Sequence, residues 1–473
     1  MRWTGLASTA VFLLSIAPSG LSPAAPTALD LRAGLLVTIA EVSHERATMW
    51  VRGDSREPVI ARYRPDGDAA DTVAAIRLDP AADLTGRAVM TGLAPATRYV
   101  YEAEHGPDRI AGAFRTAPAP GADAPARILW SGDLGGANHC RDIEDGYTIF
   151  EAMAKRRADL FLFLGDTIYA DQTCGVRQHA PGANFIATTL DQYHAKHRYN
   201  RGDTAVQRFA RTTPIFAMWD DHEVRNNFVG PFDPLMPVGR QAFLDYWPIA
   251  GPPDEPTRLY RRVRWGRHAE LFMLDTRQYR TPNATPDGPM KSMLGDVQRT
   301  WLLDGLRASD ATWKFIVSSV PFGMFTGGTY SDSWSGANAL GFQRFRNGFV
   351  HERDTILATI RDSGIRNVVV LSGDVHHAEL IRHAPAPDFA FHEFVAGPLA
   401  ARQGFKRFLD RSLNSRSLGA LGWAKNFGEV VVDGDRLVVR IVDNAGATRA
   451  SVRLPAADRT VVRAVPSDPG DTR

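Results

Sequence analysis

One stretch decides the expected fold: Leu160-Phe161-Leu162-Phe163-Leu164-Gly165-Asp166-Thr167-Ile168-Tyr169-Ala170-Asp171. Its unbroken apolar run predicts a strand buried on both faces of a sheet, with the polar residues emerging at the strand's C-terminal end. Open α/β sheets keep their chemistry at that end. Gly165 allows the chain to turn, so Asp166 and Tyr169 can face one crevice as oxygen donors for a hard metal ion. The simpler interpretation is a strand-to-loop turn in which Asp166 caps the next element.

Three further strands end in the same way along the chain. Residues 127–131 lead into Gly132-Asp133, and residues 214–219 lead into Asp220-Asp221-His222-Glu223 with Asn226-Asn227 beyond. Residues 367–371 lead into Ser372-Gly373-Asp374-Val375-His376-His377. So many ionisable groups repel one another unless a cation binds them. The alternative for Asp220-Asp221-His222-Glu223 is a solvated loop with a helix cap.

Residues 34–116 show short alternating strands separated by turn residues, which predicts a β-sandwich. The segment Leu93-Ala94-Pro95-Ala96-Thr97-Arg98-Tyr99-Val100-Tyr101 resembles the corner of a fibronectin III-like domain, where a tyrosine packs near a turn. Residues 117–126 are rich in proline and small residues and predict a linker. The second and larger domain, which carries these strand exits, is expected at 127–454, followed by a tail at 455–473. The basic segment 402–416 predicts a solvated helix face.

The length of 473 residues suggests at least two domains, and 44% hydrophobic residues indicate a globular protein. A net charge of +2 gives no reason to expect a nucleic-acid surface. Residues 1–24 resemble a signal peptide, which predicts export to the periplasm or the extracellular space. A retained anchor is the alternative, but no segment of the mature chain is long enough to span a membrane.

The chain has two cysteines, Cys140 and Cys174. In an oxidising compartment such a pair favours a disulfide over two free thiols, and a metal-bound thiolate is the other alternative. Cys140 follows the Gly132-Asp133 loop, and Cys174 follows the Gly165-Asp166 loop. A disulfide would therefore tie these loops together.

Together the strand exits supply enough donors for two metal ions that share a carboxylate. The ordered set Gly-Asp, Gly-Asp-x-x-Tyr, Asp-Asp-His-Glu and Gly-Asp-x-His resembles the calcineurin-like metallophosphoesterases. Leu274-Asp275-Thr276-Arg277-Gln278-Tyr279-Arg280 and residues 294–302 are most similar to its alkaline phosphatase D-like family. The resemblance covers most of residues 34–454. It implies a four-layer α/β/β/α sandwich behind the N-terminal β-domain.

The resemblance also implies an activity and a set of ligands. The activity is hydrolysis of phosphate monoesters or diesters by a metal-bound hydroxide. Asp166 would bridge two metals, with Asp133, Tyr169 and His376 on a ferric ion and Asp221 and Asp374 on the other ion.

The phenolate favours Fe³⁺ at the first site. The absence of histidine from residues 315–322 favours Ca²⁺ or Mn²⁺ over Zn²⁺ at the second. His222 would act with Asp221 in catalysis, with Asp220 or Glu223 orienting the His222 ring. Arg277 and Asn226 are candidates for substrate binding.

Two alternatives remain at this stage. One is a phosphodiesterase or phospholipase D-type hydrolase acting on phospholipids or cell-wall phosphodiesters. The other is a fibronectin-like binding protein without activity, against which the intact set of acids and histidines counts.

Overall fold

The computed structural model describes residues 34–136, 138–175, 178–338, 340–342 and 347–457. All of them belong to one compact unit, Ala33–Arg473. The expected signal peptide and the tail beyond residue 457 lie outside the described residues. No described helix is long and apolar enough to cross a membrane.

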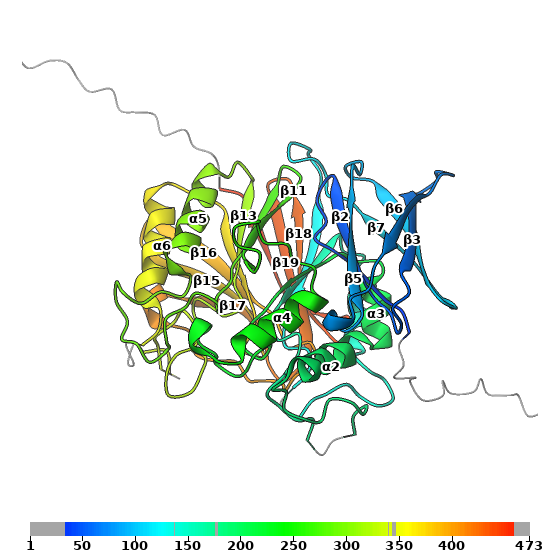
Figure 1. Ribbon diagram of the computed structural model, residues 1–473. Helices are drawn as coiled ribbons and strands as arrows, with labels where there is room; N and C mark the ends of the chain where they lie inside the picture. The colour runs from blue at the N-terminus through cyan, green and yellow to red at the C-terminus, as the bar shows by residue number, and fades with distance from the viewer. Residues whose placement is uncertain (1–33, 137, 176–177, 339, 343–346, 458–473) are drawn as a thin grey trace, which may run out of the picture. The chain divides into compact units, whose positions relative to one another are not determined.

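Two large sheets organise the described chain (Figure 1). The nine-stranded sheet has the order β20(Thr448–Pro455), β19(Arg436–Asp443), β18(Asn426–Asp433), β8(Ala126–Ser131), β9(Leu160–Leu164), β10(Ile215–Met218), β1(Leu36–Ala40), β2(Arg46–Arg52), β5(Thr85–Thr91). The seven-stranded sheet has the order β11(Arg261–Trp265), β12(Ala269–Met273), β13(Trp313–Val317), β14(Val368–Ser372), β16(Phe389–Val395), β15(Ala378–Ala386), β17(Arg416–Leu421).

Strand β9, the apolar run Leu160–Leu164, lies at the centre of the nine-stranded sheet. It pairs in parallel with β8 on one side and β10 on the other. Leu160, Leu162 and Leu164 join the core between the two large sheets, whereas Phe161 and Phe163 pack on the outer face. Alternate side chains of one strand point to opposite faces, so a continuous apolar run fills two layers at once.

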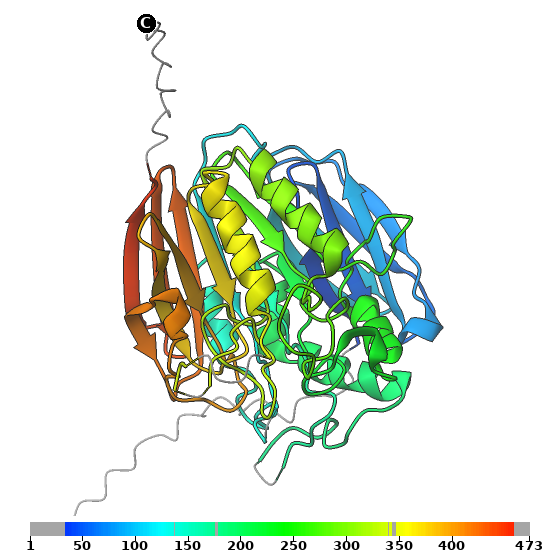
Figure 2. The same ribbon diagram turned by 90° about the vertical axis from the view of Figure 1, so that its left-hand side faces the viewer.

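Helices complete the outer layers. Phe150 of α1(Ile149–Ala154) and Phe209 of α3(Thr204–Ala210) pack with Phe161 beside α4(Met236–Tyr246). On the other sheet, α5(Gly295–Ala308) and α6(Val350–Asp362) bury Leu302 and Ile356 (Figure 2). The expected four-layer α/β/β/α sandwich is confirmed.

The N-terminal strands form a β-sandwich that shares a sheet with the rest of the fold. One layer is β4(Thr72–Ile76), β3(Val59–Pro65), β6(Arg98–His105) and β7(Asp108–Arg115). The other is β1, β2 and β5, which the parallel pairing of Ala40 with Ile215 joins to β10. The expected tyrosine corner is present, because the Ala94 N–H donates to the Tyr99 hydroxyl at 2.9 Å. The division of the chain into domains stays a prediction.

Some elements differ from the sequence prediction. The basic segment 402–416 is not a helix: it is a loop with one short 3₁₀ turn, Arg411–Leu413, before β17 begins. Gly404 bonds through its N–H to the carbonyl of His376 and through its own carbonyl to the Trp423 N–H, so this backbone is used in contacts between loops. The sequence analysis also gave no helix for α2(Leu190–Arg201), whose polar residues show no clear apolar stripe.

Candidate metal centre

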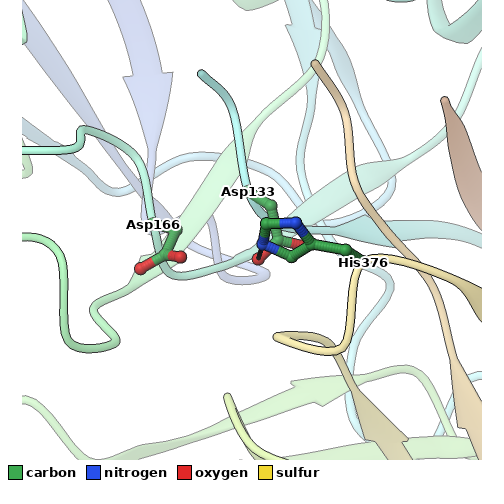
Figure 3. A group of neighbouring side chains, drawn as sticks. All are labelled: Asp133, Asp166 and His376. Carbon is green, nitrogen blue, oxygen red and sulfur yellow. Dashed lines mark ion pairs between the residues drawn. The ribbon is translucent and has the colours of Figure 1, made fainter. Parts of the chain in front are cut away.

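The side chains predicted as metal ligands meet at one end of the two large sheets. Asp133 follows β8, Asp166 follows β9 and Asp221 follows β10, which are parallel neighbours. Asp374 and His376 follow β14 of the facing sheet. The C-terminal ends of these strands therefore bring together residues that lie far apart in the sequence. Figure 3 shows Asp133 and His376 turned toward each other, with Asp166 beside them.

Four of these residues have unusual backbones. Asp133, Asp166, Asp374 and His376 have φ values of 59°, 51°, 69° and 58°. Non-glycine residues rarely adopt this left-handed conformation, and strained backbones of this kind concentrate at functional sites. Gly165 itself has φ 101°, and a Cβ there would lie 2.5 Å from Cβ of Asp220. The glycine is thus required by the close approach of two site loops.

The donors form two groups that share Asp166. One contains Asp133, Asp166 and His376, and the other Asp166, Asp221 and His222; within each group the ligand atoms lie within 4.8 Å of one another. The Tyr169 hydroxyl lies 3.1 Å from Nε2 of His376. The Tyr169 ring packs over Gly136, where a Cβ would come within 1.9 Å of the ring carbons of Tyr169.

The carboxylates are buried without enough partners. Oδ2 of Asp133, Oδ1 of Asp221 and Oδ2 of Asp374 are buried atoms that accept no hydrogen bond from the described residues. Burial, and then repulsion from neighbouring carboxylates, raises the pKa of Asp133, Asp166 and Asp374 well above the ordinary value. A buried carboxylate that lacks partners is costly unless a cation neutralises it. The donor set therefore fits metal ions.

The phenol of Tyr169 is also buried among carboxylates. Burial, and then the nearby charges of Asp166 and Asp133, raises the pKa of its phenol well above the ordinary value. A phenolate at this position would need a cation beside it.

The orientation of His222 corrects one expectation. Its Nδ1 lies 2.7 Å from Oδ1 of Asp171, and its ring stacks on Tyr169 with centroids 4.2 Å apart. Burial lowers the pKa of His222, but Asp221 and Asp171 outweigh this and raise it to about 9. Asp171, seven residues after strand β9, orients the His222 ring. Asp220 and Glu223, which the sequence analysis expected in this role, bond to other groups.

Glu223 braces the loops, a role that the sequence analysis missed. Its Oε1 accepts from the N–H and hydroxyl of Thr167 at 2.6 and 2.7 Å. Its Oε2 accepts from the N–H of Asp166 at 3.2 Å and that of Asp220 at 2.9 Å. One buried carboxylate thus fixes the loops that follow β9 and β10.

Arg277 is also placed differently from the expectation. It is fully buried, and it donates from Nε to Asp220 at 2.8 Å and from Nη1 to Asp332 at 2.9 Å. These bonds join the loop after β10 to the long loop after β13. Arg277 thus links these two loops through buried ion pairs, and its role in substrate binding stays a prediction. Asn226 is exposed, and its N–H donates to Asp171 at 2.9 Å.

The expected disulfide is present. Cys140 and Cys174 are bonded, with Cα atoms 5.4 Å apart. The bond joins the segment after Asp133 to the segment after Tyr169. Two loops that carry candidate ligands are therefore covalently linked.

The fold and this donor arrangement define a protein of the metallophosphoesterase class. A family model described as PhoD-like phosphatase matches residues 135–441, so the chain belongs to the PhoD-like phosphatase family. It is 32% identical over 323 residues to alkaline phosphatase D of Bacillus subtilis (strain 168), covering 60% of this chain and 52% of that protein. The chain thus spans about half the length of this curated relative.

Solved structures support the fold. A structure of PhoD has a TM-score of 0.75 at 22% identity, covering 93% of this chain and 92% of that one. A purple acid phosphatase from yellow lupin (Lupinus luteus) seeds has a TM-score of 0.63 at 12% identity, covering 89% of this chain and 74% of that one. The resemblance drawn from the sequence is confirmed at the level of family and fold.

Proposed function

We propose that this protein hydrolyses phosphate esters with two metal ions. The observation that carries the proposal is the set of buried carboxylate oxygens that find no partner among the described residues, arranged with two histidines around the shared Asp166. Such a pair of cations would neutralise charge on the phosphoryl oxygens and lower the pKa of an attacking water.

The donors differ between the two halves of the site, which bears on the metals. Asp133, Tyr169 and His376 would hold a ferric ion, because a buried phenol becomes a ligand only as phenolate and phenolate prefers a hard trivalent ion. Asp221 and Asp374 would hold Ca²⁺, with Mn²⁺ or Zn²⁺ as alternatives. Asp166 would contact both ions.

His222 would give a proton to the departing alkoxide. Asp171 fixes Nδ1, which leaves Nε2 as the nitrogen that can serve a substrate. General acid catalysis of this kind typically contributes about 10²–10⁴-fold. Asn226, exposed beside the same aspartate, remains the candidate for substrate binding.

A substrate panel tests the function. The purified protein is stripped with a chelator, reloaded with Fe³⁺ and Ca²⁺ singly and together, and assayed on a phosphate monoester, a diester, a phospholipid and a cell-wall phosphodiester. We expect activity only with both ions. Turnover of the diester and phospholipid without the monoester would favour a phosphodiesterase or phospholipase D-type enzyme. No turnover of any ester by the fully loaded protein would contradict the proposal.

We also propose that the protein is exported. The disulfide supports this, since such bonds persist in oxidising compartments. The apolar segment from Leu6 to Ala17 supports it as a signal-peptide core. Fractionation of cells producing the full chain, with N-terminal sequencing of the product, tests this.

A further inference from the structure

Most of the large exposed apolar side chains among the described residues lie at the end of the fold that carries the candidate metal centre. Among the described residues, thirteen large hydrophobic side chains are exposed, and Val73, Val89 and Val297 belong to β4, β5 and α5. The others lie in connections at the strand ends where the ligands lie: Ile143, Ile186, Phe232, Met290, Tyr330, Leu340, Phe342, Phe405, Phe408 and Trp423. In Figures 1 and 2 these connections gather below the strands.

Two of these aromatic residues, Phe405 and Phe408, lie on a loop that bonds to the backbone of the candidate ligand His376, and Trp423 bonds to that loop. Phe405, Phe408 and Trp423 are 62%, 58% and 71% exposed, and the rings of Phe405 and Trp423 lie 6.2 Å apart. The Gly404 N–H donates to the carbonyl of His376 at 2.7 Å, and the Trp423 N–H donates to the carbonyl of Gly404 at the same distance. The aromatic loops are thus bonded to the backbone of the site.

The exposure of Trp423 is held in place by its backbone. Its φ is 57°, a conformation that costs energy for a bulky residue. A Cβ at Gly422 would lie 3.2 Å from the carbonyl oxygen of Gly404, so the two loops approach closely. The fold therefore holds a large aromatic side chain out in solvent at an energetic cost, which is a reason to look for a function.

The surrounding charge is positive. Residues 402–425 contain six basic residues and one acidic residue, Asp410. Asp410 is buried and pairs with Arg353 at 2.9 Å, so it does not offset the exposed charges. Lys406 is 49% exposed and pairs with the buried Glu379 at 3.2 Å, so its charge is partly offset. The exposed Arg411 lies over the ring of Phe342. We call Phe405, Phe408, Trp423, Lys406 and Arg411 the rim patch.

We propose that the rim patch docks the protein onto an anionic phospholipid bilayer, with the metal centre facing the membrane. Aromatic side chains favour the boundary between headgroups and acyl chains, and nearby basic residues are attracted to anionic headgroups. A polyanionic chain could also stack on aromatic rings. The exposed aliphatic residues Ile186, Met290 and Leu340 at the same end favour a lipid surface, because they offer no stacking face. The inference does not depend on the reaction proposed above.

Co-sedimentation with vesicles tests the proposal. The metal-loaded full chain is mixed at low salt with phosphatidylcholine vesicles, with and without phosphatidylglycerol. We expect sedimentation with the anionic vesicles and little with phosphatidylcholine alone. Arg411→Gln should reduce partition about fivefold, the contribution of one basic residue near an anionic surface. The combined change Phe405→Ser, Phe408→Ser and Trp423→Asn should reduce it about tenfold or more. Asparagine is chosen at position 423 because it tolerates positive φ.

Val297→Ser, on α5, is the matched control and should sediment like the unchanged protein. Thermal unfolding establishes that each variant is folded, and if the triple variant is not, Phe408→Ser alone is used and should still lose about threefold. The proposal is overturned if the unchanged protein stays in the supernatant, or if the folded aromatic variant sediments as well as the control. It is also overturned if a single-stranded oligonucleotide displaces the protein from vesicles and the aromatic changes weaken oligonucleotide binding equally.

Discussion

Asp166 belongs to both donor groups, and its backbone is fixed in a left-handed conformation by the loop around it. Asp166→Asn should lose both metal ions and turnover together, because an amide cannot neutralise two cations. Metal content measured on the purified variant is the readout, with the exposed Asp296→Asn as control. A variant that is fully loaded but inactive would place Asp166 outside the bridge.

Tyr169 has a hydroxyl near His376 and a pKa raised by burial, so only a cation would make it a phenolate. If it binds Fe³⁺, the native protein should show a visible charge-transfer band that Tyr169→Phe removes. Tyr193→Phe is the matched control, because this buried hydroxyl donates to the Val224 carbonyl at 2.8 Å. An unchanged spectrum in Tyr169→Phe would show that the phenol is not a ligand.

His222 has two possible roles, as proton donor or as a ligand in the second group. As a donor, its replacement by alanine should retain both metals and slow alkyl phosphates by about 10²-fold or more. The loss on p-nitrophenyl phosphate should be much smaller, because that leaving group hardly needs a proton. Asp171→Asn should show the same contrast more weakly. Equal losses on both substrates at matched metal content would rule out the acid role.

At the scale of elements, the loops after β9 and β10 depend on Glu223. Glu223→Gln keeps the size of the side chain but replaces one accepting oxygen with an NH₂ group, which cannot accept from the backbone N–H groups. Leaving such buried donors unsatisfied costs about 1–3 kcal/mol each. We expect about 2 kcal/mol lower stability in urea unfolding and weaker metal binding. Glu144→Gln, at an exposed position, should change neither. Unchanged metal affinity in Glu223→Gln would show that the brace does not shape the site.

For the whole molecule, metal removal should make stability depend on pH. Burial, then carboxylate repulsion, raises the pKa of Asp133, Asp166 and Asp374, so the metal-free folded state holds protons that the unfolded state releases. Stability from these groups is present at low pH and is lost as pH rises above the ordinary carboxyl pKa.

The Tm of the chelated protein should therefore fall between about pH 5 and about pH 8. The difference in Tm between the metal-loaded and the chelated protein should widen to about 5 °C over this range. Calorimetry of both forms at each pH measures this. A gap that narrows with rising pH would contradict the raised carboxyl pKa values.

The local pattern of the sequence was sufficient to predict the sandwich and to predict which acidic and histidine side chains meet at one end of the sheets. Strands such as Leu160–Leu164 are continuous apolar runs, and each candidate ligand follows its strand within a few residues, so position along the chain predicts position in space. Parallel strands place their C-terminal ends at one edge whatever the connections between them contain. The tyrosine corner and the cysteine pair were likewise readable from short motifs.

Tertiary structure alone decided which charged residues support the site and which surround it. Arg277, Glu223 and Asp171 are ordinary polar residues in the sequence, and their roles come from partners that the folded chain brings to them. The loop at residues 402–416 reads as a basic helix face, yet its backbone bonds to the loops of His376 and Trp423. A hydrogen bond between distant loops depends on the packing of whole sheets, and no local pattern of side chains encodes it.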